Sequence, residues 1–298
     1  MTIAAGFVCE EGVLLCADTE HTGWTSKFHD SKLDHFEIPG GKIAFALAGH
    51  SSFAWSAIQK CRDRLQGVAP QDIMVELEQL LETEYRRHVL GHPNYTDVGY
   101  ELLIAVWVPP ERVALYATSE TCMRKVDGFE CIGIGHELAS FIIRPTFLRL
   151  MPERKALSLA AYALVEVKES ISGCGGMSVY LLLQNDGNVG TLTSLHRGKC
   201  EQLEGYSKAY NFTTRELLMA LADEDREDSD FERYLTETFN QRILEVRHKW
   251  TKERQAKEAE FAALNPHLTP DEAKQTFRQL SMGLLPGIPT SQKRLKEA

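Results

Sequence analysis

Apolar residues near the start of the chain fall into short runs that turn residues separate. Ile3–Cys9 and Val13–Ala17 are apolar and rich in β-branched residues, and the CEEG segment between them predicts a tight hairpin. Leu33–Ile38 and Lys42–Leu47 flank the turn PGG and predict a second hairpin. All four runs are almost continuously apolar, which is typical of strands that are covered on both faces.

Four longer segments carry apolar residues at helical spacing. Ser51–Leu65 opens with serines that suit an N-cap, and Pro70–Leu90 has proline at its start and a glycine after its end. His136–Arg149 and Glu153–Ser170 predict a second pair of helices further along the chain.

Six more short apolar runs predict strands on either side of the second helix pair. They are Glu101–Val108, Arg112–Thr118, Thr121–Val126, Glu130–Ile134, Met177–Leu183 and Val189–Thr193. Residues 2 to about 200 therefore alternate strands, two helices, strands, two helices and strands. Because the strands are apolar on both faces, this order predicts an α+β fold with two sheets between two helix layers.

The composition changes after residue 205, where the chain becomes dense in charged residues of both signs. Apolar residues there step by three or four positions along one long predicted helix: Phe231, Leu235, Phe239, Ile243, Val246 and Trp250. A shorter helix is predicted over Pro270–Leu280. We therefore divide the chain into a domain of residues 1–205 and a helical C-terminal extension of residues 206–298. The extension could fold onto its own domain or pack against a neighbouring subunit.

Composition and charge exclude several classes of function. The 298 residues are 43% hydrophobic and carry a formal net charge of -9, which argues against nucleic acid as a partner. No apolar run approaches the roughly 18 residues of a membrane span, and no signal peptide precedes the first strand. The seven cysteines are odd in number and several lie in apolar runs, which indicates reduced thiols in a cytoplasmic protein. His21, His29 and His35 lack metal-ligand spacing and are interpreted as solvated.

The first 22 residues bring a known family into view. TIAAGFVCEEGVLLCADTEHT resembles the opening of proteasome β subunits and related bacterial peptidases, which begin with threonine and run through a strand, a glycine turn and apolar residues to Ala-Asp. Counting from Thr2, Gly12 and Asp18 fall at the turn glycine and the aspartate of that family.

Three later segments extend this resemblance in the same order. KLDHFEIPGGKIAFALAGH resembles the lysine strand of the family and the Ala-Gly that follows its next strand. GFECIGIGHELA resembles its Gly-x-Gly turn into a helix, and ESISGCGGMSVYLL resembles its Asp-x-x-Ser-Gly segment before a strand. The resemblance covers residues 2 to about 200.

The resemblance implies an N-terminal-nucleophile (Ntn) hydrolase with a four-layer αββα sandwich. It implies a threonine-type peptidase or amidohydrolase that needs no metal or organic cofactor and acts on a peptide or protein substrate. It also implies a cytoplasmic homo-oligomer, with a ring as one form of assembly. Neither a membrane nor a nucleic acid is expected as a partner, and the sequence does not indicate whether an ATPase partner exists.

The family's catalytic roles carry over to particular residues. Removal of Met1 would expose Thr2 as a nucleophile without a propeptide, and its α-amino group, with a pKa of about 8, could act as the base. Asp18 would pair with the catalytic lysine, and Gly49 would supply the oxyanion N–H. Lys32 is the candidate lysine, although an ungapped count from Thr2 places Asp34 at that position. Alternate residues of a strand share a face, so Lys32 could still reach the site.

Two alignments are open for the residues that support the Thr2 amine. Alignment on ESISG assigns these supports to Glu169 and Ser172 and is preferred, whereas alignment on CGG places Ile171 and Cys174 there. Ile134 stands where the family carries a serine in its Gly-Ser-Gly turn.

These departures leave two alternatives to a proteasome-like threonine hydrolase. One is a catalytically inactive structural or binding subunit of a proteasome-like assembly. The other is an Ntn amidase or transpeptidase with a narrow substrate, whose acyl group passes to an amine instead of water.

Overall fold

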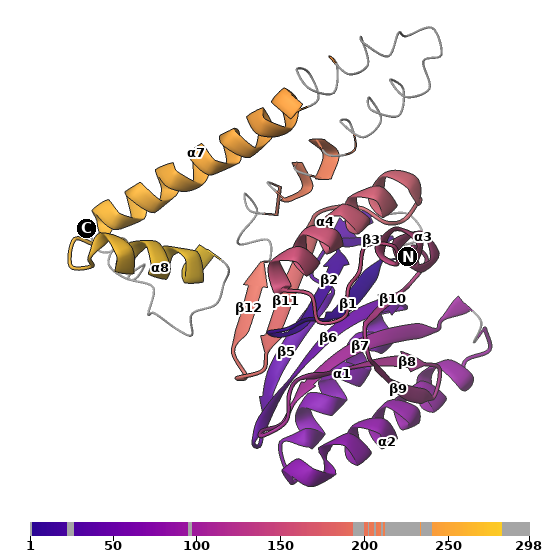
Figure 1. Cartoon of the computed structure of the whole chain (residues 1–298). Coiled ribbons are helices and arrows are strands. Elements are labelled where there is room, and N and C mark those ends of the chain that lie inside the picture. The colour runs from indigo at the N-terminus through magenta and orange to yellow at the C-terminus, as the bar shows by residue number, and fades with distance from the viewer. Residues whose placement is uncertain are drawn as a thin grey trace, which may run out of the picture. The chain divides into compact units, whose positions relative to one another are not determined.

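A computed structural model of the chain describes residues 2–22, 27–94, 97–192, 200–201, 203–205, 207–209, 211, 233 and 240–281. The chain divides into two compact units, Met1–Glu204 and Gly205–Ala298. The first unit contains both large sheets and the helices that pack on them (Figure 1).

The first large sheet carries the N-terminal hairpin. Its strands are antiparallel in the order β10 (Phe129–Ile132), β1 (Ala4–Val8), β2 (Gly12–Asp18), β11 (Ser178–Gln184) and β12 (Val189–Leu192). The predicted hairpin is confirmed, with Ala4 opposite Ala17 and Val8 opposite Val13. Only glycine fits at Gly12, because a Cβ there would lie 2.1 Å from the carbonyl oxygen of Leu183 on β11.

The second large sheet contains the other predicted hairpin. Its antiparallel order is β5 (Leu33–Ile38), β6 (Gly41–Gly49), β7 (Tyr100–Trp107), β8 (Ala114–Ser119) and β9 (Cys122–Val126). A separate two-stranded sheet joins β3 (Glu20–Thr22) to β4 (Lys27–His29). The sequence pattern did not predict this small sheet, because its strands are three residues long and mostly polar.

One apolar cluster fills the space between the two large sheets. Leu15 and Leu181 of the first sheet and Leu103 and Leu115 of the second belong to it, and all four side chains are buried. Because these strands are covered on both faces, their sequences are continuously apolar and do not alternate between apolar and polar residues.

Helices cover the outer faces of both sheets (Figure 1). α1 (Ser51–Leu65) and α2 (Ile73–Tyr85) bury a second apolar cluster against the second sheet. α3 (His136–Ile143) contacts β1 and β10, and α4 (Glu153–Ser170) contacts β2 and β11. The fold is therefore α+β, with antiparallel sheets and packed helices.

Two predicted helices differ from the observed ones. Pro70–Leu90 is divided into a 3₁₀ turn at Pro70–Asp72, α2, and a π-helical turn at Arg86–Leu90. α3 ends at Ile143 and not at Arg149, because Pro145 has no N–H with which to continue the hydrogen bonds of the helix.

The described part of the second unit is a pair of helices in contact, α7 (Asn240–Leu264) and α8 (Pro270–Ser281). The rings of Phe261 and Phe277 lie 5.7 Å apart between them. α8 agrees with its prediction and begins with a capping box, in which the Thr269 N–H donates to Glu272 Oε2 at 2.9 Å and the Glu272 N–H donates to the Thr269 hydroxyl oxygen at 3.4 Å. Predicted helical positions Phe231, Leu235 and Phe239 lie outside the described residues. No helix in the described part of the chain is long and apolar enough to cross a membrane.

Candidate active site

A buried ion pair joins Lys32 to Asp18. Asp18 is the last residue of β2 and Lys32 directly precedes β5; Lys32 Nζ lies 2.7 Å from Asp18 Oδ1, and both side chains are fully buried. The same Nζ donates to the carbonyl oxygen of Glu20 at 2.5 Å. Burial lowers the pKa of the Lys32 ammonium, while the neighbouring Asp18 carboxylate raises it. Because a buried charge is costly without a partner, each side chain holds the other in place.

The Asp18 carboxylate also fixes the backbone next to Thr2. Its Oδ1 accepts the N–H of Ile3 at 3.1 Å, and the Asp18 N–H donates to the Ile3 carbonyl at 3.2 Å. Its Oδ2 accepts the N–H of Gly175 at 3.0 Å. Thr2 itself is only 2% exposed. One carboxylate therefore joins the lysine, the residue after Thr2 and the segment before β11.

The ungapped count from Thr2 assigns the position of the catalytic lysine to Asp34, but the Asp34 side chain is not beside Asp18. Asp34 Oδ2 lies 2.5 Å from Arg62 Nη2, and Arg62 belongs to α1. α1 packs on the outer face of the second sheet, so Asp34 points away from Asp18. The structure thus brings Lys32, and not residue 34, to Asp18.

Two glycines of the candidate site, Gly133 and Gly49, have left-handed backbone conformations. Gly133 has φ +88°, and a Cβ there would lie 2.4 Å from the Thr2 carbonyl oxygen. Gly49, the last residue of β6, has φ +85°, and a Cβ there would lie 2.4 Å from the carbonyl oxygen of Gly99. Both positions require glycine, because L-residues with a side chain rarely adopt this backbone conformation and would clash.

The two candidate pairs of amine supports lie in different surroundings. Glu169, near the end of α4, and Ser172, just after it, are exposed. Cys174 is buried, and this burial raises the pKa of its thiol to about 11, with a further increase from Asp18 and a decrease from Lys32. Cys174 therefore lies within the electrostatic reach of the Lys32–Asp18 pair.

A cavity of about 860 Å³ contains Thr2. Gly49 lines it, as does Ile134, which is 51% exposed at the position where the resembled family has serine. Sequence analysis missed most of the remaining polar and aromatic lining: His21, Phe28, Ser51, Ser52, Tyr85, Asp97, Tyr100, Glu101, Ser119 and Glu120. These residues come from strands, loops and helix ends that are far apart in the sequence, so no local pattern marks them.

The interpretation of His21 as a solvated histidine is wrong, because its side chain is buried. Its side chain is 7% exposed and stacks on Phe28, with ring centroids 4.8 Å apart and planes 5° from parallel. Burial lowers its pKa, and the Lys32 charge lowers it further. The neutral imidazole is therefore favoured beside the Thr2 cavity.

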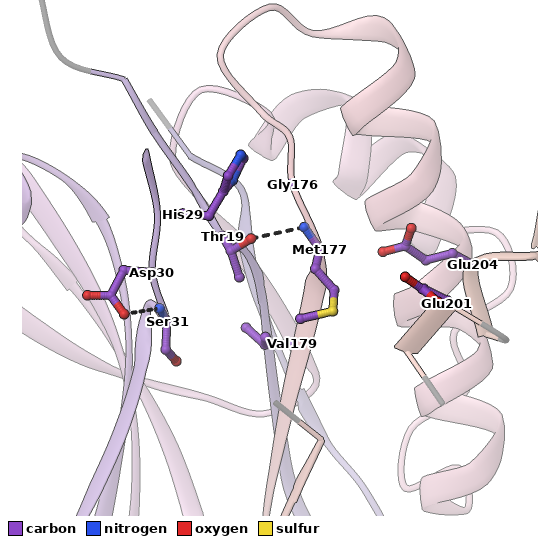
Figure 2. A pocket seen from close by; sticks show the side chains of 9 residues that line it. All are labelled: Thr19, His29, Asp30, Ser31, Gly176, Met177, Val179, Glu201 and Glu204. Carbon is purple, nitrogen blue, oxygen red and sulfur yellow. Dashed lines mark hydrogen bonds between the residues drawn. The ribbon is translucent and has the colours of Figure 1, made fainter. Parts of the chain in front are cut away.

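A second cavity, of about 510 Å³, is bounded by the chain just before β3, the end of β4 and the residues after it, the start of β11, and Glu201 and Glu204 (Figure 2). Its lining residues are Thr19, His29, Asp30, Ser31, Gly176, Met177, Val179, Glu201 and Glu204. The Thr19 hydroxyl oxygen accepts the Met177 N–H at 2.9 Å, which joins the two segments. None of the predicted catalytic residues lines it, so the Thr2 cavity is the candidate active site. Within the described ranges, no three His, Cys, Asp or Glu side chains are grouped as a metal ion would require.

Comparison with known proteins identifies the fold. No family model and no curated protein matches the sequence. An Anbu (Gly-1) mutant from Hyphomicrobium sp. strain MC1 matches 76% of this chain and 100% of its own, with TM-score 0.62 and 17% identity. The Anbu ancestral β-subunit from Yersinia bercovieri matches 74% of this chain and 97% of its own, with TM-score 0.62 and 16% identity.

A third solved structure, the helical assembly of the Anbu complex from Pseudomonas aeruginosa, matches 73% of this chain and 95% of its own, with TM-score 0.62 and 14% identity. Over about three quarters of its length, the chain has the Anbu fold. This is a proteasome-like fold, as the sequence resemblance implies. At these identities the likeness to Anbu concerns the fold alone.

Proposed function

We propose that this chain is a subunit of a proteasome-like assembly and a threonine hydrolase that cleaves peptide or amide bonds. Thr2 acts as the nucleophile once Met1 is removed. The observation that carries the proposal is the buried Lys32–Asp18 pair, whose carboxylate also holds the N–H of Ile3, the residue next to Thr2. The proteasome-like fold of the solved Anbu structures supports the same class.

In the first step, the Thr2 hydroxyl oxygen attacks the carbonyl carbon of the substrate amide. Its proton passes to the Thr2 α-amine, directly or through a water, because a free α-amine has a pKa of about 8. The positive charge of Lys32 lowers the pKa of the hydroxyl and disfavours a second ammonium on the amine. Asp18 holds Lys32 in place through a charge-assisted hydrogen bond.

The tetrahedral intermediate carries its negative charge on the former carbonyl oxygen. The N–H of Gly49 donates to this oxyanion in the cavity that Thr2 shares with it. Collapse of the intermediate breaks the C–N bond, and the proton held by the Thr2 amine goes to the leaving amine. Water then attacks the ester on Thr2, which releases the acid and restores the hydroxyl.

For the supports of the Thr2 amine we favour the alignment on Cys174 over the one on Glu169 and Ser172. The reason is electrostatic, since Asp18 and Lys32 both influence the pKa of the buried Cys174 thiol. The Gly175 N–H, next in the chain, binds Asp18. Cys174 is then a positioning residue for the Thr2 amine, and its thiol takes the place of the serine hydroxyl in the Asp-x-x-Ser-Gly segment of the resembled family.

We extend the proposal to architecture and assembly. The first unit is a four-layer αββα sandwich, and residues 206–298 are an extension outside the catalytic domain. Homo-oligomers are supported by the helical assembly of the related Anbu complex and by two exposed apolar side chains, Phe141 (77%) and Leu148 (69%). Light scattering of the variant Phe141→Asp tests this assembly. Leu90→Asp is the control, because it alters another exposed apolar residue. We expect Phe141→Asp to reduce the particle mass and Leu90→Asp to leave it unchanged.

Covalent labelling tests the catalytic proposal. Intact mass of the purified protein is expected to show loss of Met1, followed by addition of one equivalent of a peptide epoxyketone. Thr2→Ala should not be labelled, while Thr2→Ser, which keeps a hydroxyl and an α-amine, should be labelled. Retention of Met1, or equal labelling of the wild type and Thr2→Ala, would overturn the threonine mechanism. If no variant is labelled and the mass still indicates an oligomer, the chain is an inactive structural subunit.

A further inference from the structure

The described charged side chains that line the Thr2 cavity all have the same sign. The charged residues of its described lining are all carboxylates, Asp97, Glu101 and Glu120, and neither lysine nor arginine is among them. Glu101 is held by the Gly133 N–H, which donates to its Oε2 at 3.0 Å. Carboxylates gathered along a concave wall produce a negative potential inside the cavity.

Aromatic rings line the same cavity. Phe28 is 52% exposed, whereas Tyr85 and Tyr100, with ring centroids 5.2 Å apart, are only 7% and 4% exposed. The faces of aromatic rings attract cations because of their negative quadrupole. The exposed Phe28 ring also offers contact surface to the methylene carbons of a long side chain.

His21 adds an independent polar feature to this wall. Its side chain is more than nine-tenths buried, and its Nε2 has no hydrogen-bond partner among the described residues. Burial lowers its pKa, so the ring is neutral at pH 7 and one of its nitrogens accepts a hydrogen bond. In the tautomer that carries its proton on Nδ1, Nε2 is a buried acceptor without a partner among the described residues, and an N–H donor of a ligand would satisfy it.

We propose that the cavity binds the cationic side chain of a lysine or arginine residue that adjoins the scissile amide. This inference rests on the proposed function for the position of the amide beside Thr2. An ammonium or guanidinium group is attracted by the carboxylates and by the exposed Phe28 ring, and its N–H groups can donate to His21. A glutamate side chain is repelled by the same carboxylates, and an aliphatic one gains no attraction from them.

Binding to the full-length Thr2→Ala variant tests the inference without any catalytic step. Calorimetry compares three N-acetylated peptide amides, Leu-Leu-X, in which X is arginine, norleucine or glutamate. We expect the arginine peptide to bind about tenfold more tightly than the norleucine peptide, and the glutamate peptide to bind most weakly. The arginine advantage should shrink at about 0.5 M salt. Equal affinities, the reverse order or no binding of any peptide would overturn the inference.

Two substitutions locate the effect in the cavity. Asp97→Asn with Glu120→Gln should reduce the arginine advantage several-fold, whereas Glu111→Gln, in the turn at the far end of β7, should leave it unchanged. An equal effect of both changes would assign the preference to net charge and overturn a cavity site. Labelling of Thr2 is a separate measurement, so failure of the nucleophile and failure of the cation preference give different results.

Discussion

Lys32 Nζ lies 2.7 Å from Asp18 Oδ1, and neither side chain is exposed to solvent. Lys32→Met removes the ammonium and leaves a buried carboxylate without its ionic partner. We expect a loss of about 3–5 kcal/mol in the free energy of unfolding, measured by urea denaturation.

The chain offers a matched control for this substitution. Lys42→Met breaks the Lys42–Glu37 pair, in which the glutamate is 80% exposed, and should cost less than about 1 kcal/mol. The double variant Lys32→Met with Asp18→Asn should lose less than the sum of its single changes, since no buried charge remains. An additive double variant would contradict a coupled pair.

Gly133 controls the space around the Thr2 carbonyl. In Gly133→Ala, the new Cβ would lie 2.4 Å from that oxygen, so Thr2 must shift and the rate of labelling by the epoxyketone should fall at least about tenfold. Gly40→Ala is the control, because Gly40 also has a positive φ of 74° but its Cβ would meet only the Pro70 ring. Both variants should lose about 1–3 kcal/mol of stability from the strained backbone, while Gly40→Ala keeps its labelling rate. Equal labelling rates in the two variants would contradict the prediction.

The lowered pKa of His21 links stability to pH. Below about pH 6.5 the unfolded chain takes up a proton at this position that the folded chain binds only at lower pH. The free energy of unfolding should therefore fall as the pH drops from 6.5 towards the lowered pKa, by at most about 1.4 kcal/mol per pH unit for this one group.

His21→Phe keeps the stack on Phe28 and removes the titrating group. Its unfolding free energy should depend less steeply on pH than that of the wild type below pH 6.5, and the two slopes should agree at pH 7–8. His35, whose pKa is also lowered by burial, remains in both proteins and accounts for part of the remaining slope. Parallel curves over the whole range would refute the assignment to His21.

Cysteine reactivity reports the burial of Cys174. Of the seven cysteines, Cys122 is exposed and the other six are buried. The native protein at pH 8 should react rapidly with one equivalent of Ellman's reagent, and the denatured protein with seven. Cys174, with a pKa raised to about 11, stays a protonated thiol under these conditions. Cys122→Ser should abolish the rapid phase, and a rapid phase that persists would place another thiol at the surface.

Local patterns were enough to predict the framework of this protein. The apolar runs and turns of the two hairpins, and the spacing from Thr2 to Gly12 and Asp18, lie within short stretches of sequence. The ends of helices were predicted less well: α3 stops at Ile143, because Pro145 cannot donate the next hydrogen bond of the helix even though the apolar periodicity continues.

Tertiary structure alone decided which side chains meet at the site. Counting along the sequence left two candidate positions for the catalytic lysine, Lys32 and residue 34. The structure decides between them, because the Lys32 ammonium lies against Asp18 in the interior while Asp34 pairs with Arg62. Asp18 also binds the N–H of Gly175, 157 residues away, so the surroundings of Cys174 depend on how two distant strands are packed. Burial and long-range electrostatics arise only when such segments converge. The sequence by itself therefore determined the elements and the threonine at their start, and the packing of the sheets decided the charged partners beside it.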